Sequence, residues 1–253
     1  MLKIVGVIPA RYHSTRLEGK LLLPIQGIPM IQRVYEQAVK SRYLHHVVVA
    51  ADDLRIKSFV ESLGGTVVMT SIDHVCGTDR VAEAVQNFDA DIVVNIQGDQ
   101  PFVDPAMIDE LVNAMLQHPQ YEMTTSIKKI RKEDLRSPSV VKVVFDKSGK
   151  ALYFSRALIP YPLHRQELVV YEHIGLYAYR KDFLQRIARL PIGFLERTES
   201  LEQLRILENG YSIMVVETKC QNPDFSGFGV DTQQELEQAE RLLSNFINNS
   251  KKA

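Results

Sequence analysis

Short apolar runs rich in β-branched residues alternate with helical segments through the first half of the chain, and no other feature constrains the fold as strongly. In the helical segments the apolar residues recur three or four positions apart, as they do on one side of a helix. Short buried strands separated by helices predict a parallel sheet with right-handed crossovers. Pro9 is expected to end the first strand, because proline has no N–H for the ladder. The runs are Ile4–Ile8, His46–Ala51, Thr66–Met69 and Asp91–Ile96.

Capping residues set the expected helix boundaries. Asp52-Asp53 and Asp104-Pro105 are typical helix starts, and Thr78 is expected to cap a helix that runs to about Gln86. Residues spaced as in the capping box, Ser200 with Gln203 and Thr232 with Glu235, predict two late helices.

The pattern changes in the second half, where strands follow one another across turns such as Asp146–Gly149. Strands are predicted over 123–130, 140–145, 151–154 and 173–179. The expected fold class is therefore α/β, a doubly wound and mostly parallel sheet with an antiparallel inserted subdomain in the second half. We expect a single domain over 1–253, with the insertion within 123–217.

Composition excludes several classes of protein. The formal net charge of −1 gives no basic field for nucleic acid or a membrane surface. Cys76 and Cys220 lie far apart, and no zinc-ligand spacing is present. No apolar stretch approaches the roughly 20 residues that cross a bilayer, and the first run is too short for a signal peptide. We expect a soluble cytoplasmic protein with a small ligand.

A basic segment directly follows the first strand. It contains Arg11, Ser14, Arg16, Gly19 and Lys20. Ligands of open α/β sheets sit beyond the carboxyl ends of the strands, and guanidinium and ammonium groups suit phosphate oxygens. We therefore favour polyphosphate binding over a merely solvated loop. The segment matches neither the Walker pattern nor Gly-x-Gly-x-x-Gly.

Two acidic residues are candidate Mg²⁺ ligands. Asp99 comes directly after the fourth run, and Asp231 precedes the cap Thr232. Mg²⁺ prefers one or two carboxylates together with substrate phosphates and water. Taken alone, Asp99 could be an ordinary turn residue and Asp231 an ordinary residue before a helix. Together with the basic segment they suit phosphoryl transfer.

Two further groups of residues are weaker candidates. The turn at Cys76-Gly77 before Arg80 could offer free N–H groups to a base or phosphate, although on local grounds alone we favour an ordinary capped helix. Polar side chains in the second half could line a pocket for a hydroxylated, acidic substrate, or could belong to a half-buried sheet. These are Arg156, His173, Tyr177, Tyr179, Glu202 and Gln203.

The order and spacing of these motifs resemble the 3-deoxy-D-manno-octulosonate (Kdo) cytidylyltransferases, also called CMP-Kdo synthetases, over nearly the whole chain. The resemblance rests on Ile8-Pro-Ala-Arg11 with Ser14, Arg16 and Gly19-Lys20, on Asp73-His with Gly77-Thr-Asp-Arg80, on Asn95-Ile-Gln97-Gly-Asp99, on Phe154-Ser-Arg156, on His173-Ile-Gly-Leu-Tyr177, on Leu201-Glu-Gln203-Leu-Arg205 and on Gly229-Val-Asp231-Thr232.

The resemblance implies a nucleotidyltransferase fold and a reaction of CTP with Kdo that gives CMP-Kdo and pyrophosphate for lipopolysaccharide assembly. It implies Mg²⁺ as cofactor and a homodimer, with 123–217 supplying sugar-binding residues and much of the interface. Lys20, Arg16 and Asp99 would be the catalytic residues. The implied nucleotide-binding residues are Pro9, Ala10, Arg11, Ser14, Arg16, Lys20, Cys76, Gly77 and Arg80. The implied sugar-binding residues are Gln97, Arg156, His173, Tyr177, Glu202 and Gln203, and the metal ligands are Asp99 and Asp231.

The chain departs from the usual family pattern in a few places. Glu18 adds a negative charge beside the basic segment, and Cys76 stands where Ser is common. The segment Ile159–Pro162 is closer to capsule-associated and 8-amino-sugar variants, which leaves 8-amino-Kdo and the capsule pathway as alternatives. A non-catalytic nucleotide sensor is a more distant alternative. A dinucleotide oxidoreductase is disfavoured because Gly-x-Gly-x-x-Gly is absent.

Overall fold

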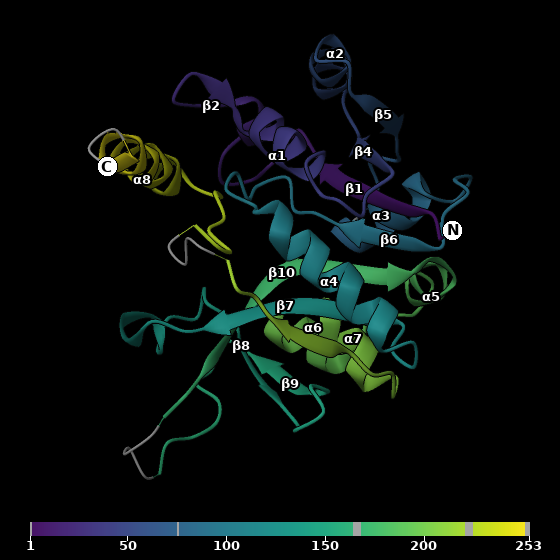
Figure 1. The fold of residues 1–253 in the computed structure, drawn as a ribbon, viewed down its shortest axis with the longest axis vertical. Coiled ribbons are helices and arrows are strands. Elements are labelled where there is room, and N and C mark those ends of the chain that lie inside the picture. The colour runs from purple at the N-terminus through teal and green to yellow at the C-terminus, as the bar shows by residue number, and fades with distance from the viewer. Residues whose placement is uncertain (1, 75, 164–167, 221–224, 251–253) are drawn as a thin grey trace.

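The computed structural model describes residues 2–74, 76–163, 168–220 and 225–250. A single twisted sheet runs through the molecule, with helices on both of its faces (Figure 1). From one edge to the other, its main path consists of β11 (Met214–Glu217), β7 (Met123–Lys129), β10 (Tyr171–Arg180), β6 (Ile92–Asn95), β1 (Ile4–Ala10), β4 (His46–Ala51) and β5 (Thr66–Met69).

Strand direction divides the sheet as the sequence predicts. The strands β6, β1, β4 and β5 are all parallel, which confirms the crossover pattern of the first half. In the second half β10 is antiparallel to both of its neighbours, whereas β11 pairs with β7 in parallel. The hairpin of β8 (Lys142–Phe145) and β9 (Ala151–Ser155) attaches to β10 through β8. The segment 123–217 therefore continues the same sheet.

Helices cover each face of the sheet and bury two apolar clusters. Buried side chains of β1, β4 and β6 alternate between the clusters, as the two-residue period of a strand requires. One face packs against α1 (Met30–Ala38), α2 (Leu54–Ser62), α4 (Pro105–Gln117) and α8 (Gln233–Ser250). The other face packs against α3 (Gly77–Ala84), α5 (Lys181–Ile187), α6 (Phe194–Glu199) and α7 (Gln203–Glu208).

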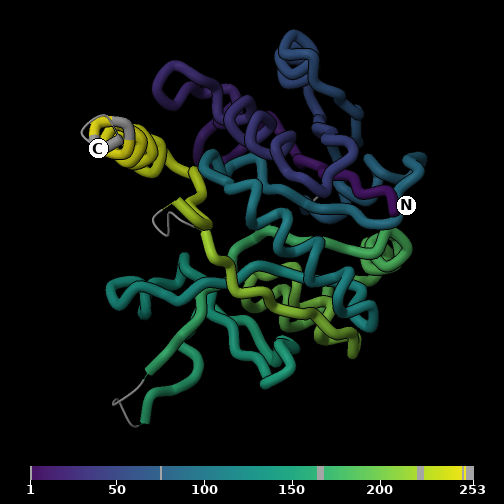
Figure 2. Tube along the Cα trace, viewed as in Figure 1, coloured from purple at the N-terminus to yellow at the C-terminus, as the bar shows by residue number. Residues whose placement is uncertain are grey.

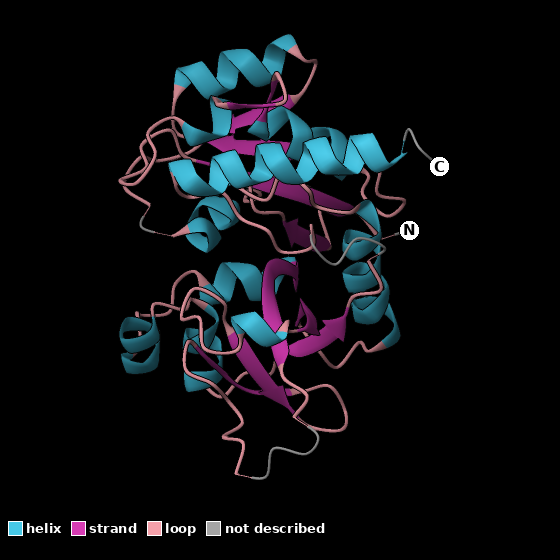
Figure 3. Cartoon of the chain, turned by 90° about the vertical axis from the view of Figure 1, so that its left-hand side faces the viewer, coloured by secondary structure: helices cyan, strands magenta, loops and turns pink. Residues whose placement is uncertain are grey.

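The last part of the chain returns to the first. After β11 the chain crosses the molecule, and α8 lies beside the small hairpin of β2 (Pro24–Ile25) and β3 (Ile28–Pro29) (Figure 2). Figure 3 shows α8 from the side, lying across the half of the molecule that contains the parallel strands. The backbone N–H of Gln26 donates to Glu240 at 2.8 Å. This return brings the segment before α8, with Asp231, toward the ends of β1 and β6.

The predicted end of the first strand at Pro9 is wrong, because β1 continues to Ala10. The carbonyl of Val7 accepts from Ile96, so alternate residues Val7 and Pro9 turn toward the β6 side. Pairing with β6 stops at Val7, whereas Pro9 lies opposite Ala50 of β4. The missing N–H of Pro9 therefore falls where no ladder bond is lost.

Two predicted helix caps are also wrong, whereas the capping box of Thr232 and Glu235 is confirmed. The cap of α3 is Cys76, and Thr78 lies inside the helix. Ser200 ends α6 in the left-handed conformation, with φ of 53°, and Glu202 precedes α7. Ser200 therefore belongs to the end of a short helix that the sequence pattern did not indicate.

Candidate active site

The candidate site lies at one edge of the sheet, where the carboxyl ends of β1 and β6 meet. The basic segment follows β1, and Gln97 to Asp99 follow β6, so these adjacent strands deliver both groups to one place. The opposite direction of β10 brings its first half, with His173, to this same edge, where Tyr177 pairs with Asn95. This is the edge at which open α/β sheets bind ligands.

Lys20 lies between the two candidate metal ligands. Its Nζ atom is 2.7 Å from Oδ2 of Asp99 and 2.7 Å from Oδ1 of Asp231, and its side chain is only 6% exposed. Arg16 contacts the other oxygen of Asp231 at 2.7 Å. Burial alone would raise the pKa of Asp231, but hydrogen bonds and charges from Lys20 and Arg16 hold it below the ordinary value. The structure thus brings together residues from the two ends of the chain.

Glycines allow the close approach of these segments. Gly19 has φ of 63°, a conformation that residues with a Cβ rarely adopt, and it places Lys20 at the start of a short 3-10 helix. A Cβ atom at Gly98 would lie 2.9 Å from the carbonyl oxygen of Pro9. The backbone beside Asp99 can therefore pack against the end of β1 only with glycine at position 98.

Asp99 and Asp231 fit a Mg²⁺ ion that is shared with a phosphate ligand. One ammonium group contacts both carboxylates, so a small cation fits between them. Within the described ranges, no cluster of three or more His, Cys, Asp or Glu side chains could hold a metal by itself. Mg²⁺ commonly takes one or two carboxylates and completes its shell with phosphate oxygens and water. These two residues are therefore the ones that would hold the ion.

A cavity of about 210 Å³ opens beside Lys20. Arg11 lines it, is exposed, and makes no ion pair or hydrogen bond with the described residues. Ala10 is fully buried, and Ser14 is half-buried, outside this lining. Eight of the predicted nucleotide and metal residues line the cavity, together with Leu21 and His74, which the sequence argument did not select. The predicted ones are Pro9, Arg11, Lys20, Cys76, Gly77, Arg80, Asp99 and Asp231.

Arg80 also lines this cavity, but its charge is already paired. Its guanidinium donates to Asp52 at 3.0 Å and to the Thr70 hydroxyl at 2.7 Å, and the whole residue is 3% exposed. This side chain joins α3 to the end of β4, and a role for Arg80 in nucleotide binding stays a prediction. Cys76 faces the cavity from the turn before α3, where burial and the charge of Glu202 raise the pKa of its thiol.

A second cavity, of about 440 Å³, adjoins the first. All six predicted sugar-binding residues line it: Gln97, Arg156, His173, Tyr177, Glu202 and Gln203. Asp99 and Asp231 line both cavities, so the carboxylates stand at the junction of the two spaces. The arrangement can hold two ligands in contact beside a cation site.

His173 lies deep in the wall of the second cavity as a neutral ring. Burial lowers its pKa to about 3. Its Nε2 atom is 2.9 Å from the Thr125 hydroxyl, and its Nδ1 atom is 3.4 Å from the Gln203 amide. The ring edge packs against Phe154, with ring centres 4.9 Å apart. His173 therefore supplies no positive charge at neutral pH, and a ligand that hydrogen-bonds its ring must replace Thr125 or the more distant Gln203.

Arg156 and Glu172 hold the outer wall of this cavity. The Arg156 guanidinium donates to the backbone carbonyls of Pro138 and Ser200, which ties separate loops together. Glu172, which the sequence argument missed, lies 3.6 Å from Lys128 of the neighbouring strand. Burial raises the pKa of Glu172, which Lys128 partly offsets. Strand alternation predicts that Glu172 points away from His173, and only the register of β7 with β10 could have indicated its partner.

Glu18 pairs with His13 at the surface of the basic segment. Its carboxylate lies 3.4 Å from Nδ1 of His13, and both side chains are exposed. It is absent from the linings of the two adjoining cavities. The added negative charge therefore does not face the cluster of Lys20 and the two aspartates.

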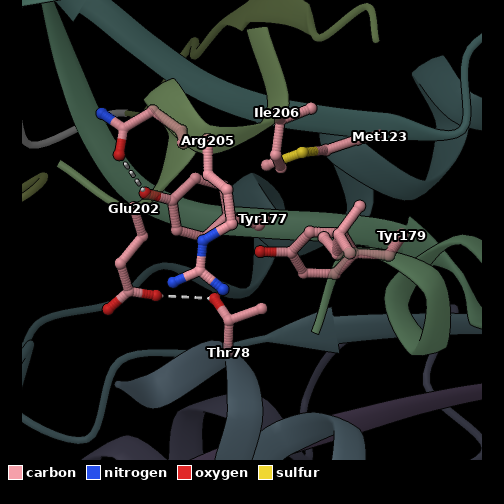
Figure 4. A pocket seen from close by; sticks show the side chains of 9 residues that line it. Thr78, Met123, Tyr177, Tyr179, Glu202, Arg205 and Ile206 are labelled. Atoms are coloured by element: carbon pink, nitrogen blue, oxygen red, sulfur yellow. Dashed lines mark hydrogen bonds between the residues drawn. The ribbon is translucent and has the colours of Figure 1, made fainter. Parts of the chain in front are cut away.

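A small cavity of about 10 Å³ is lined by Glu202 and Gln203, and Figure 4 shows Glu202 beside it. Tyr177 and Tyr179 form part of its wall, and burial raises the pKa of both phenols. Thr78 points up from α3 and donates to Glu202 at 2.7 Å. Tyr177, Glu202 and Gln203 line both this cavity and the second cavity.

Comparisons with known proteins agree on one family. The sequence profile of the family described as cytidylyltransferase matches residues 5–215. A 3-deoxy-manno-octulosonate cytidylyltransferase from Trichlorobacter lovleyi is 45% identical, covering 96% of this chain and 99% of the relative. An 8-amino-3,8-dideoxy-manno-octulosonate cytidylyltransferase from Shewanella halifaxensis is also 45% identical, with coverage of 96% and 99%.

Solved structures give the same result at the level of the fold. The structure of a CMP:2-keto-3-deoxy-manno-octonic acid synthetase complexed with CTP superimposes with a TM-score of 0.91 at 42% identity, covering 96% of this chain and 99% of that one. A 4-diphosphocytidyl-2C-methyl-D-erythritol synthase from Anaerococcus prevotii has a TM-score of 0.63 at 13% identity, with coverage of 96% and 99%. The latter similarity shows the shared fold alone. Separately, none of the described helices is long and apolar enough to span a membrane.

Proposed function

The chain belongs to the cytidylyltransferase family, and on that premise we propose that it joins CTP to Kdo to give CMP-Kdo and pyrophosphate. The product would supply lipopolysaccharide assembly. One observation carries the proposal: Lys20 contacts both Asp99 and Asp231 at the junction of two adjoining cavities. A triphosphate in one cavity and a sugar acid in the other would meet at these carboxylates.

On the nucleotide side, cations neutralise the triphosphate. Arg11 is unpaired among the described residues, and Lys20 and Arg16 stand at the carboxylates. Their charges lower the energy of the phosphates as negative charge shifts to the leaving pyrophosphate. The turn at Cys76-Gly77 closes the other side of this cavity.

Asp99 and Asp231 would hold Mg²⁺, which when bound neutralises phosphate charge and orients the oxygen atoms around the α-phosphorus. The anomeric hydroxyl of the sugar attacks the α-phosphorus in line with the bond to the β-phosphate. A new oxygen–phosphorus bond forms, the bond to the bridging oxygen breaks, and pyrophosphate leaves. Catalysis consists of positioning and charge neutralisation, without a covalent enzyme intermediate.

In the sugar cavity, neutral side chains would hydrogen-bond the sugar and a cation would bind its carboxylate. His173 and Tyr177 offer hydrogen bonds from the cavity wall, and Gln97 stands near the carboxylates. Arg156, whose guanidinium lines the same cavity, is the cation that suits the carboxylate of a sugar acid. Holding the acceptor hydroxyl against the phosphorus supplies the proximity that the reaction needs.

Pyrophosphate release tests the proposal directly. We expect release with CTP and Kdo in the presence of Mg²⁺, and little with ATP, GTP or UTP. Asp99→Ala should lower turnover by at least about 10²-fold, because a charge-stabilising group is removed, while circular dichroism shows an intact fold. A non-catalytic sensor would bind CTP and release no pyrophosphate. Full turnover in Asp99→Ala would show that the metal assignment is wrong.

The 8-amino sugar is the second candidate substrate. The relative from Shewanella halifaxensis carries that name and has the same identity to this chain as the Kdo enzyme from Trichlorobacter lovleyi. Carboxylates of Glu172 and Glu202 line the sugar cavity and could pair with an ammonium group. Comparison of kcat/KM for Kdo and 8-amino-Kdo, with N-acetylneuraminate as an unrelated sugar acid, decides between them.

We also propose that the protein is a homodimer, joined through the segment 123–217. This segment exposes large apolar side chains, which is unusual for a surface that faces only water. They include Leu152, Tyr161, Leu163 and Val169, with exposed fractions of 57%, 83%, 75% and 55%. Sedimentation velocity should give a dimer, and Leu152→Glu combined with Leu163→Glu should give a monomer. The exposed Leu54→Glu is the matched control, and a wild-type monomer at micromolar concentration would refute the interface.

A further inference from the structure

Glu202 occupies the boundary between the two cavities. It lines the nucleotide cavity, the sugar cavity and the small cavity of about 10 Å³. Within the described part of the chain no Lys, Arg or His pairs with its carboxylate, although Lys20 and Arg11 line the same nucleotide cavity. A carboxylate that could swing freely would be drawn toward those cations. The orientation of Glu202 therefore requires a restraint.

Thr78 supplies that restraint. Its Oγ1 atom donates to Oε2 of Glu202 at 2.7 Å, across 124 residues of sequence. Thr78 is 9% exposed and belongs to the first turn of α3. Figure 4 shows its side chain directed from α3 toward Glu202. A threonine hydroxyl in a helix usually bonds a backbone carbonyl of the preceding turn, whereas this one reaches the residue that precedes α7.

The contact is not what holds α7 in place. Arg205 of α7 pairs with Glu196 of α6 through contacts of 2.6 Å from both Nε and Nη2, and its Nη1 lies 3.9 Å from Oδ1 of Asp79 of α3. These buried ion pairs already join α7 to its neighbours. The hydrogen bond from Thr78 is therefore available to set the direction of one side chain, without carrying the packing of the helices.

We infer that Thr78 is a positioning residue, whose hydroxyl fixes Glu202 so that the remaining oxygen, Oε1, faces the sugar cavity and accepts a hydrogen bond from a sugar hydroxyl. This inference rests on the proposed function. Oε1 accepts no hydrogen bond from the described residues, so its capacity is open to a ligand. Gly77, directly before Thr78, lines both cavities. One rigid turn thus borders the nucleotide and orients a ligand of the sugar.

The test compares Thr78→Val, which has nearly the same shape but no hydroxyl, with Thr78→Ser, which keeps the hydroxyl. Thr78→Val should raise KM for Kdo by about tenfold, the effect of one hydrogen bond to a charged group, while KM for CTP changes by less than about twofold. Thr78→Ser should restore a KM near the wild-type value. Thermal unfolding monitors the fold, and if Thr78→Val does not fold, Thr78→Ala against Thr78→Ser gives the same comparison.

A double-mutant cycle with Glu202→Ala separates positioning from packing. Once the carboxylate is absent, Thr78→Val should cause no further increase in KM for Kdo. Additive effects, an unchanged KM in Thr78→Val or a failure of Thr78→Ser to restore it would each overturn the role of Thr78. Absence of pyrophosphate release by the wild-type enzyme would instead overturn the proposed function, so the two failures are distinguishable.

Discussion

The Nζ atom of Lys20 lies 2.7 Å from Oδ2 of Asp99, although 79 residues separate them in the sequence. The same nitrogen contacts Asp231, which comes from the other end of the chain. Before a ligand binds, the lysine charge holds two carboxylates together that would otherwise repel each other. The same charge is the one that the proposed reaction directs to the phosphates. The charge of Lys20 therefore pairs with the two carboxylates in the free protein and, in the proposed reaction, with the phosphates of the substrate.

Lys20→Met should lower kcat for pyrophosphate release by about 10²- to 10³-fold, because it removes a buried charge that stabilises the transition state. Met keeps the length and most of the volume of the side chain, so the decrease in kcat can be attributed to the missing charge. Lys40→Met, at an exposed position after α1, is the matched control and should be nearly silent. A Lys20→Met enzyme with more than a tenth of wild-type kcat would show that this charge is not catalytic.

Lys20→Met should weaken catalysis but strengthen the binding of a divalent metal ion when no nucleotide is present. Since Lys20 occupies the space between Asp99 and Asp231, a divalent ion must compete with its ammonium group. Mn²⁺ binding, followed by electron paramagnetic resonance without CTP, should be weak in the wild-type protein and about tenfold tighter in Lys20→Met. Asp231→Asn in the Lys20→Met background should remove the gain. Equal affinities in the wild-type and Lys20→Met proteins would show that the lysine does not compete.

The sequence could predict the meeting of Lys20 and Asp99 because each follows a short apolar strand, and such strand ends meet at one edge of a parallel sheet. The position of Asp231 was harder to predict from the sequence, because it depends on the path of the chain between β11 and α8. Sequence reasoning failed where a residue had a partner that no local pattern reveals. Thr78 reaches Glu202 instead of capping α3, and Glu172 faces Lys128 only because of the register of β10 with β7.

Arg80 and Arg11 are both predicted to bind the nucleotide, and the structure places one in a buried ion pair and the other at an exposed position. Arg80→Met should lower the free energy of unfolding by about 3–5 kcal/mol, because it leaves Asp52 as an uncompensated buried charge. Arg11→Met should leave the unfolding free energy nearly unchanged and raise KM for CTP by about tenfold, because an exposed cation at the cavity is lost. Urea denaturation and steady-state kinetics on both variants measure the contrast. An Arg80→Met protein as stable as the wild type would refute the structural role.

His173 makes stability depend on pH in a predictable direction. Its pKa is about 3 in the folded protein, because of burial, against an ordinary value of 6.5. Between those values the unfolded chain binds the proton that the folded protein excludes, so stability falls as pH falls below about 6.5. The expected loss from this residue between pH 7 and pH 5 is about 2 kcal/mol, since one pKa unit corresponds to about 1.4 kcal/mol.

His173→Gln removes the titrating ring while keeping an amide that can bond Thr125, so its stability should vary less with pH than that of the wild type. Urea denaturation at pH 7 and pH 5 on both proteins gives the two slopes directly. His46→Gln, at the exposed start of β4, is the control. It tests whether replacing any histidine reduces the dependence of stability on pH. If His173→Gln and the wild type lost equal stability over this range, the ring would be protonated in the folded protein, and a neutral hydrogen-bonding role for His173 in the sugar cavity would have to be abandoned.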